Sequence, residues 1–179
     1  SCPHIFDFYS GKTPVFDIMS TNSSILSDYS APDKEIIGWL SGRDLQTATP
    51  GQYTLKPLEQ TGGQPKALKI SVPGTTYTAY LSFRQPNGYT YPNAPANKPN
   101  GVILDVTNGS GSQSFLVTNA TNINAPLAMG KAYRIGISGL FVTVTGISNN
   151  QASVTISSTA TISPVPPTPT PTPTTPTLS

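Results

Sequence analysis

The sequence has few of the residues on which many folds and active sites depend. Charged residues make up 10% of its 179 positions, against a typical share of about 25%. There is one cysteine, Cys2, and one histidine, His4. A single cysteine excludes an internal disulfide and a thiolate zinc cluster within this chain. Ser-His-Asp or Cys-His catalysis would have to use His4, and ordinary loop residues explain the Cys2 and His4 pair equally well.

Long apolar runs and uninterrupted helical stretches are also missing. No run of about 18 apolar residues occurs, so the sequence predicts no membrane span. The 19 prolines and 15 glycines interrupt helices throughout the chain. These features exclude a coiled coil and a long helical bundle, and they favour a β-rich fold.

The net charge of +2 is unevenly distributed along the chain. Residues 1–59 carry −3, from seven acidic and four basic residues, and residues 60–179 carry +5, from six basic residues and Asp105. Lys66 and Lys69 form one close basic pair, whereas nucleic-acid binding needs a basic stripe. We therefore predict no nucleic-acid partner.

Short alternating segments indicate the architecture of residues 46–160. In the segment 76–84, four apolar positions alternate with polar ones, which predicts a strand with one buried face and one solvated face. Similar segments occur at 52–55, 67–72, 102–106, 114–117, 132–137, 140–145 and 152–156. Seven or eight short strands separated by turns predict an antiparallel β-sandwich. The proline-rich stretch 85–100 is predicted to be a long surface loop.

One short helix is predicted within residues 30–40. Ser30 is a suitable N-cap and Pro32 suits the first turn, while Ile36, Ile37 and Leu40 form an apolar stripe. A helix this short is marginal alone. We therefore expect its isoleucine, tryptophan and leucine side chains to dock against another surface.

The composition changes abruptly near residue 161. Residues 164–179 contain seven prolines, six threonines and no charge, which predicts an extended polyproline II spacer of about 50 Å. We expect residues 161–179 to be a disordered linker that separates a secreted domain from a further domain or a cell-surface attachment; a tail with nothing beyond it is the alternative.

Five ordered blocks of sequence resemble the C-terminal half of the gametolysin-like zinc metallopeptidases. The blocks are Val-Phe-Asp-Ile-Met-Ser at 15–20, the helix with Lys-Glu-Ile-Ile-Gly-Trp-Leu at 30–40, Gly-Gln-Tyr-Thr-Leu-Lys-Pro-Leu-Glu at 51–59, Ala-Leu-Lys-Ile at 67–70, and Tyr-Leu-Ser-Phe-Arg-Gln-Pro-Asn-Gly-Tyr at 80–89. The resemblance covers about residues 7–157. It implies that residues 1–45 are the end of a catalytic domain, with a Met-turn and the short helix, and that a β-sandwich domain follows at 46–160.

The resemblance also implies roles for particular residues. Met19 would lie in the Met-turn beneath the zinc ions of metzincin-type enzymes, and Asp17 would help to shape that turn; from residue type alone, Met19 is better explained as a core side chain. The zinc-binding helix of the family, with two histidines four residues apart, is absent from this chain. His4 lacks the context of the third ligand and is a weak metal candidate. We therefore expect no metal on this chain and no catalytic residue within it.

The leading functional hypothesis is a C-terminal fragment of a secreted zinc endopeptidase that hydrolyses extracellular or cell-wall protein. The parent would bind zinc, whereas the fragment itself would be inactive, so whether the chain should be called an enzyme stays open. Its partners would be the missing N-terminal catalytic half, a protein or peptide substrate and cell-wall glycan. The expected localisation is secreted or at the cell surface.

Two further hypotheses come from other classes of protein. A tethered β-sandwich module could bind glycan, with aromatic side chains as stacking platforms, namely Trp39, Tyr77, Tyr80, Tyr89 and Tyr91. The simpler interpretation places Trp39 and Tyr77 in the core and leaves Tyr89 and Tyr91 to anchor a loop. A structural cell-surface protein is the third hypothesis. Three glycosylation sequons, at Asn22, Asn108 and Asn119, matter only in a host that glycosylates.

Overall fold

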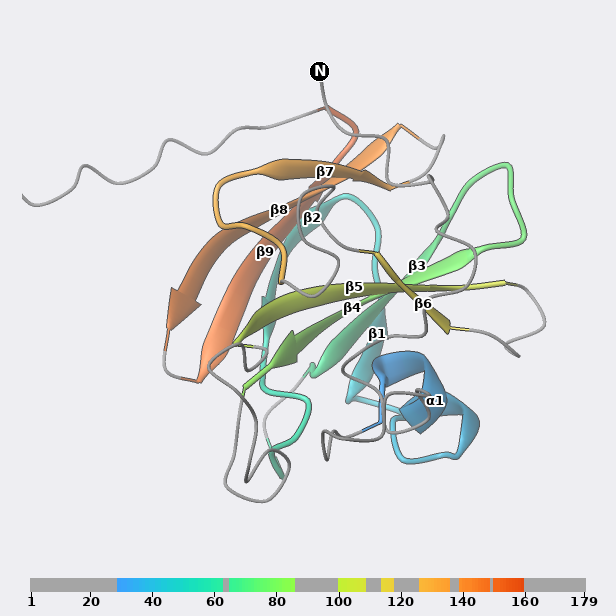
Figure 1. Cartoon of the computed structure of the whole chain (residues 1–179), viewed down its shortest axis with the longest axis vertical. Helices are drawn as coiled ribbons and strands as arrows, with labels where there is room; N and C mark the ends of the chain where they lie inside the picture. Colours follow the sequence, from blue (N-terminus) through green and yellow to red (C-terminus); the bar gives the residue numbers. More distant parts are fainter. Residues whose placement is uncertain are drawn as a thin grey trace, which may run out of the picture.

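The described part of the protein is mainly β, with two sheets and one short helix that packs on the larger sheet (Figure 1). The computed structural model describes residues 29–62, 65–85, 100–108, 114–117, 126–135, 139–148 and 150–159. In chain order its elements are α1 (Ala31–Ile36), β1 (Leu45–Thr47), β2 (Gly51–Leu55), β3 (Ala67–Ser71), β4 (Thr78–Arg84), β5 (Gly101–Thr107), β6 (Ser114–Val117), β7 (Ala132–Ile135), β8 (Leu140–Ser148) and β9 (Gln151–Ser157). All eight segments predicted as strands are strands, which confirms the expectation of a β-rich fold.

The strands form one five-stranded and one four-stranded sheet. The five-stranded sheet has the order β1-β3-β4-β5-β6, and the four-stranded sheet has the order β2-β9-β8-β7. Neighbouring strands are antiparallel except for β1, which pairs in parallel with β3 through Leu45 opposite Ala67. The described residues therefore hold nine strands, one more than predicted, and the pairing is not entirely antiparallel.

The larger of the two hydrophobic clusters in the described residues receives side chains from both sheets. The five-stranded sheet contributes alternate residues such as Leu81 and Leu104, and the four-stranded sheet contributes residues such as Val144 and Val154. Tyr77 is half-buried and packs against this core. Removal of these apolar faces from water is the main force that holds the two sheets together.

The other face of the five-stranded sheet is also buried, because α1 lies against it (Figure 1). Tyr80, Ser82 and Arg84 alternate with the core residues of β4, and each is at most 5% exposed. The prediction that this strand has a solvated face is therefore wrong. Alternation identifies two faces of a strand, but it does not show that a helix covers the polar one.

Helix α1 begins as predicted but buries less of its apolar surface than expected. Ser30 is the N-cap, and its hydroxyl accepts a hydrogen bond from the Asp33 backbone N–H at 3.3 Å. Leu40 is buried in a small cluster with Ala31. Ile36, Ile37 and Trp39 are exposed instead, so the expectation that all these side chains dock is wrong. Only the Leu40 side of the segment faces the sheet.

The predicted division into residues 1–45, 46–160 and 161–179 stays a prediction. Residues 1–28 and 160–179 lie outside the described residues, as does nearly all of the predicted loop at 85–100. Within the described part, α1 contacts β4 and β5 directly. The helix and the five-stranded sheet thus share a buried interface.

Candidate functional site

A layer of polar side chains is enclosed between α1 and the five-stranded sheet. We call it the polar layer; it consists of Glu35, Glu59, Lys69, Tyr80, Ser82 and Arg84. The residues come from α1, from the segment after β2, and from β3 and β4. Buried polar groups are costly unless they are paired. The layer is therefore the part of the described structure in which side-chain chemistry is most constrained.

One half of the polar layer is centred on the Glu35 carboxylate. Its Oε1 atom accepts from Lys69 Nζ at 2.6 Å, and its Oε2 atom accepts from the Tyr80 hydroxyl at 2.5 Å. Lys69 Nζ also lies 5.6 Å from the centroid of the Tyr80 ring, within the range of a cation–π contact. Glu35 thus joins the helix to two adjacent strands of the sheet.

The surroundings change the pKa values of two of these groups. Burial, assisted by the hydrogen bond to Glu35 and the charge of that carboxylate, raises the pKa of Tyr80 to about 12. Burial alone would lower the pKa of Lys69, but the hydrogen bond and the negative charge of Glu35 outweigh it, so this pKa is raised. Tyr80 stays protonated and Lys69 stays charged at neutral pH, so neither is prepared to act as a base or a nucleophile.

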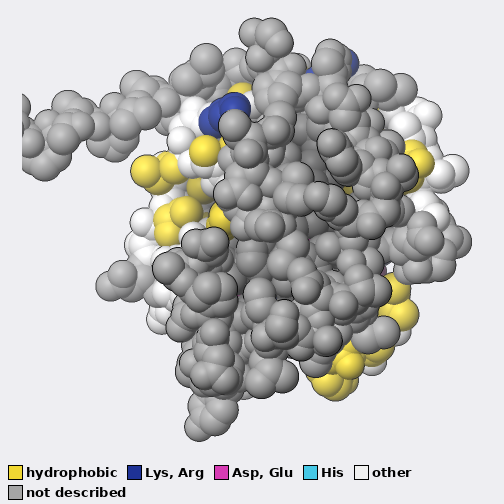
Figure 2. Space-filling model, viewed as in Figure 1, with side chains coloured by type: hydrophobic (Ala, Val, Ile, Leu, Met, Phe, Trp, Pro, Cys, Tyr) yellow, Lys and Arg dark blue, Asp and Glu magenta, His cyan; other side chains and the backbone are white. Residues whose placement is uncertain are grey.

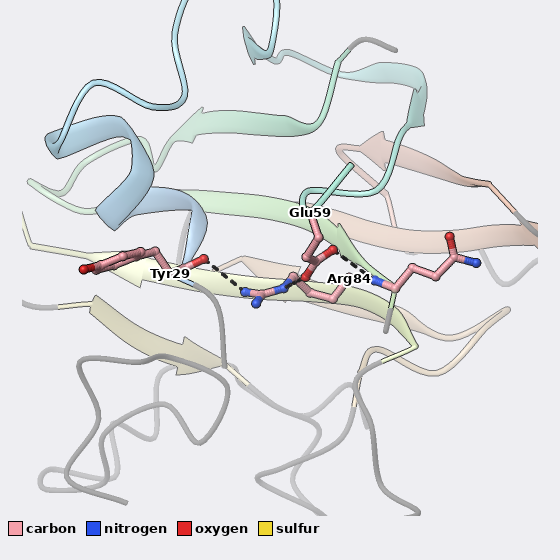
Figure 3. Close-up of polar contacts among 4 residues, drawn as sticks. Tyr29, Glu59 and Arg84 are labelled. Carbon is pink, nitrogen blue, oxygen red and sulfur yellow. Dashed lines mark hydrogen bonds and ion pairs between the residues drawn. The ribbon is translucent and has the colours of Figure 1, made fainter. Parts of the chain in front are cut away.

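The other half of the polar layer is the ion pair between Glu59 and Arg84 (Figure 3). Both side chains are 1% exposed, and Arg84 Nε donates to Glu59 Oε1. The second carboxylate oxygen accepts from the Gln85 backbone N–H at 3.2 Å, and Arg84 Nη1 donates to the Tyr29 carbonyl at 3.4 Å. The pair therefore links the segment after β2, the end of β4 and the residue before the helix cap.

Ser82 lies between these two groups on β4 and is completely buried. Its hydroxyl has no hydrogen-bond partner within the described parts of the chain. A buried hydroxyl without a partner costs stability. The contacts of the polar layer hold the helix, the segment after β2 and the sheet together.

The residues predicted to support a metal site or to bind glycan do not belong to the polar layer. His4, Asp17, Met19, Tyr89 and Tyr91 all lie outside the described residues. Among the residues that the structure does describe, no three His, Cys, Asp or Glu side chains come together as a metal site. The described part therefore does not fit a zinc ion, and we assign no metal-dependent step to it.

The structure separates the remaining aromatic candidates. Tyr80 is 5% exposed and cannot stack on a sugar, whereas Tyr77 is half-buried and packs in part against the core. Trp39 is 65% exposed, which contradicts the simpler interpretation of it as a core residue. Its indole meets the Tyr29 ring edge-to-face, with centroids 5.4 Å apart and planes at 87°. Hydrophobic side chains are exposed where α1 reaches the surface (Figure 2).

Sequence reasoning missed the polar layer, although one signal was present. Lys69, Arg84 and Glu59 belong to segments predicted as strands or close to them, in a chain with few charges. Charged residues in such segments are often solvated, and no sequence pattern showed that α1 would cover them.

Comparisons with known proteins do not identify the chain. Within the described ranges, no helix is long and apolar enough to cross a membrane. No family model, no curated protein and no solved structure matches this sequence or fold.

Proposed function

We propose that this chain is the C-terminal part of a secreted zinc metalloendopeptidase similar to gametolysin, and that its two sheets form a non-catalytic β-sandwich. The observation that carries the proposal is the polar layer. Its ionic contacts join residues from four of the five blocks on which the resemblance depends. Residues from four of the blocks therefore pack together in this chain, in two groups of contacts that share strand β4.

The Glu35 contacts connect three of these blocks. Glu35 belongs to the helix block, Lys69 to the Ala-Leu-Lys-Ile block and Tyr80 to the block that ends in Arg-Gln-Pro. The Glu35 side chain is 28% exposed, and its two donors compensate the carboxylate for part of the water that the helix and the sheet exclude. These three residue types therefore depend on one another for physical reasons.

The ion pair connects the fourth block to the same unit. Glu59 ends the Gly-x-Tyr-x-Leu block, and Arg84 lies in the strand of the last block. A fully buried charge without its partner costs about 3–5 kcal/mol. Two residues of the resembling blocks therefore form a buried ion pair in this chain.

The catalytic chemistry belongs to the upstream part in this proposal. A zinc ion held by histidines there would polarise the scissile carbonyl and lower the pKa of bound water. Asp17 and Met19 would support that site from below. The described sheets would position the catalytic half or the extracellular protein substrate. The secreted location and the linker role of residues 161–179 belong to the same proposal.

The first test is the coding sequence upstream of Ser1. A helix motif of the HExxH or QExxH type with a third histidine supports the proposal. The encoded protein should then contain one zinc ion by mass spectrometry and should lose peptide hydrolysis with a chelator. A start codon or a secretion signal directly before Ser1, or hydrolysis that persists without metal, would refute it.

The alternative functions are weaker on structural grounds. A tethered glycan-binding module loses Tyr80 as a stacking platform, since that side chain is buried, and Tyr77 is half-buried. A polysaccharide pull-down with Tyr89→Ala and Tyr91→Ala tests whether these two tyrosines bind glycan. A structural cell-surface protein would be indicated by an upstream zinc motif whose ligands are substituted.

A further inference from the structure

We propose that the exposed surface at the end of α1 binds the Pro-Thr segment 164–179 of a neighbouring copy of this chain. We call this surface the α1 patch; it consists of the exposed residues Ile36, Ile37 and Trp39 and of the half-buried Tyr29, whose ring contacts Trp39. This inference does not depend on the metallopeptidase proposal.

The α1 patch is apolar and exposed although it follows a well-capped helix. Trp39, Ile36 and Ile37 are 65%, 62% and 44% exposed. Gly38 has a φ of +80° and turns the chain between them, so that the three side chains are held outside the core. The run 36–39 contains no charged residue. Exposed apolar groups gathered in this way are typical of a binding surface.

The α1 patch is also rigid. The Trp39 backbone N–H donates to the Lys34 carbonyl at 2.7 Å, and the next residue, Leu40, is buried. The Tyr29 carbonyl is held by Arg84, and the two aromatic rings meet at 87°. A ligand therefore loses little affinity to the ordering of these side chains.

The composition of residues 164–179 matches this surface. The segment has seven prolines and no charge, which predicts a polyproline II conformation. Aromatic-lined surfaces are the common receptors for such segments, because proline rings pack on aromatic faces and the ligand is already extended. An acidic or a basic partner would find no opposite charge in the run 36–39. An uncharged partner needs no such charge and loses no binding energy from its absence.

The distance between the end of β9 and α1 favours binding to the α1 patch of a neighbouring copy. β9 ends at Ser157 on the side of the molecule opposite to α1 (Figure 1). A segment that starts there would have to travel around its own fold, whereas it can reach the α1 patch of a second molecule directly. Such a head-to-tail contact uses two different surfaces and therefore forms either closed rings or open-ended chains.

The first experiment is a titration of the full chain with a synthetic peptide of residues 163–179. Trp39 is the only tryptophan, so its fluorescence reports on the α1 patch alone. We expect a saturable change. A control peptide with all seven prolines replaced by alanine should have no effect. No response to the native peptide, or an equal response to the control peptide, would overturn the proposal.

A second experiment locates the contact with labelled peptide and fluorescence anisotropy. Trp39→Ala should weaken binding at least about tenfold, whereas Ile147→Ala, at a residue 40% exposed on β8, should leave it unchanged. Unchanged binding to Trp39→Ala refutes the site. If circular dichroism shows that this variant is misfolded, the two peptides on the unmodified chain decide the question.

Sedimentation velocity tests whether the contact forms between two copies of the chain. The average mass of the full chain should rise with concentration and fall when excess peptide is added. A chain that binds peptide yet stays monomeric at every concentration contradicts an intermolecular contact. Quenching of Trp39 by a soluble polysaccharide but not by the peptide would assign the α1 patch to sugar and also overturn the proposal.

Discussion

The Arg84 guanidinium and the Glu59 carboxylate pair inside the protein, with both side chains 1% exposed. Glu59 follows β2 of the four-stranded sheet, and Arg84 ends β4 of the five-stranded sheet. The pair therefore fixes the segment that leaves one sheet against a strand of the other. Because Arg84 also holds the Tyr29 carbonyl, the contact extends to the start of α1.

Glu59→Gln should be strongly destabilising. The change leaves the buried guanidinium without its counter-charge, which costs about 3–5 kcal/mol in the free energy of unfolding. Urea denaturation of the full chain measures the loss. The matched control is Asp44→Asn, which breaks the more exposed Lys66–Asp44 pair at 3.4 Å and should cost less than about 1 kcal/mol. Equal losses for the two variants would contradict this prediction.

Two buried serines should respond to alanine in opposite directions. Ser82→Ala removes a hydroxyl that is 0% exposed and without a hydrogen-bond partner in the described residues, so we expect stabilisation of about 1 kcal/mol. Ser30→Ala removes the N-cap of α1 and should cost about 1 kcal/mol. Thermal and urea unfolding check both variants. A loss of stability in Ser82→Ala would show that the hydroxyl is paired.

The protein should lose stability in alkali through Tyr80. Its folded-state pKa is about 12, above the value of about 10 for an unfolded tyrosine. The folded state therefore holds the proton more tightly, and the free energy of unfolding falls as the pH rises from about 10 to about 12. The raised pKa of Lys69 acts in the same direction.

Tyr80→Phe isolates this effect. Urea midpoints at pH 9 and pH 11.5 should differ less in the variant than in the unmodified chain. Absorbance titration of the folded protein should also lose one tyrosine that ionises near pH 12. A pH dependence that is identical in both proteins would count against the assigned role of Tyr80.

Gly101 should not tolerate a side chain. A Cβ atom at this position of β5 would lie 2.5 Å from Pro126 Cβ, so Gly101→Ala must displace the segment that pairs with β5 through Leu127 N–H and the Val102 carbonyl. We expect a loss of about 1–3 kcal/mol. Gly146→Ala on β8 is the control, since its nearest contact is Ser153 Cβ at 3.9 Å. Similar midpoints for the two variants in urea would refute the steric argument.

Local patterns in the sequence were sufficient for most of the secondary structure. Alternation predicted β4 and β9, and Ser30 and Pro32 predicted the start of α1. β1 was missed because three residues are too few to show a period. Its pairing depends on β3, a strand 20 residues away.

The candidate site was less accessible to sequence reasoning. Nothing near Lys69 or Tyr80 in the sequence indicates that Glu35 lies beside them, since the contact spans 34 and 45 residues. The exposure of Trp39 was also missed, because an amphipathic pattern of one and a half turns leaves the buried side undetermined. Tertiary packing determined both features.

The partner of β2 has a consequence for biosynthesis. Gly51 pairs with Ile156, and Leu55 pairs with Ala152. Strand β2 therefore cannot pair until β9, the last strand of the described residues, is present. A nascent chain that ends before Gln151 can form the pairs of the five-stranded sheet but leaves β2 without its neighbour in the four-stranded sheet. Contacts this distant in sequence form slowly. The four-stranded sheet can therefore close only after β9 has left the ribosome, and until then β2 has a strand edge without its partner.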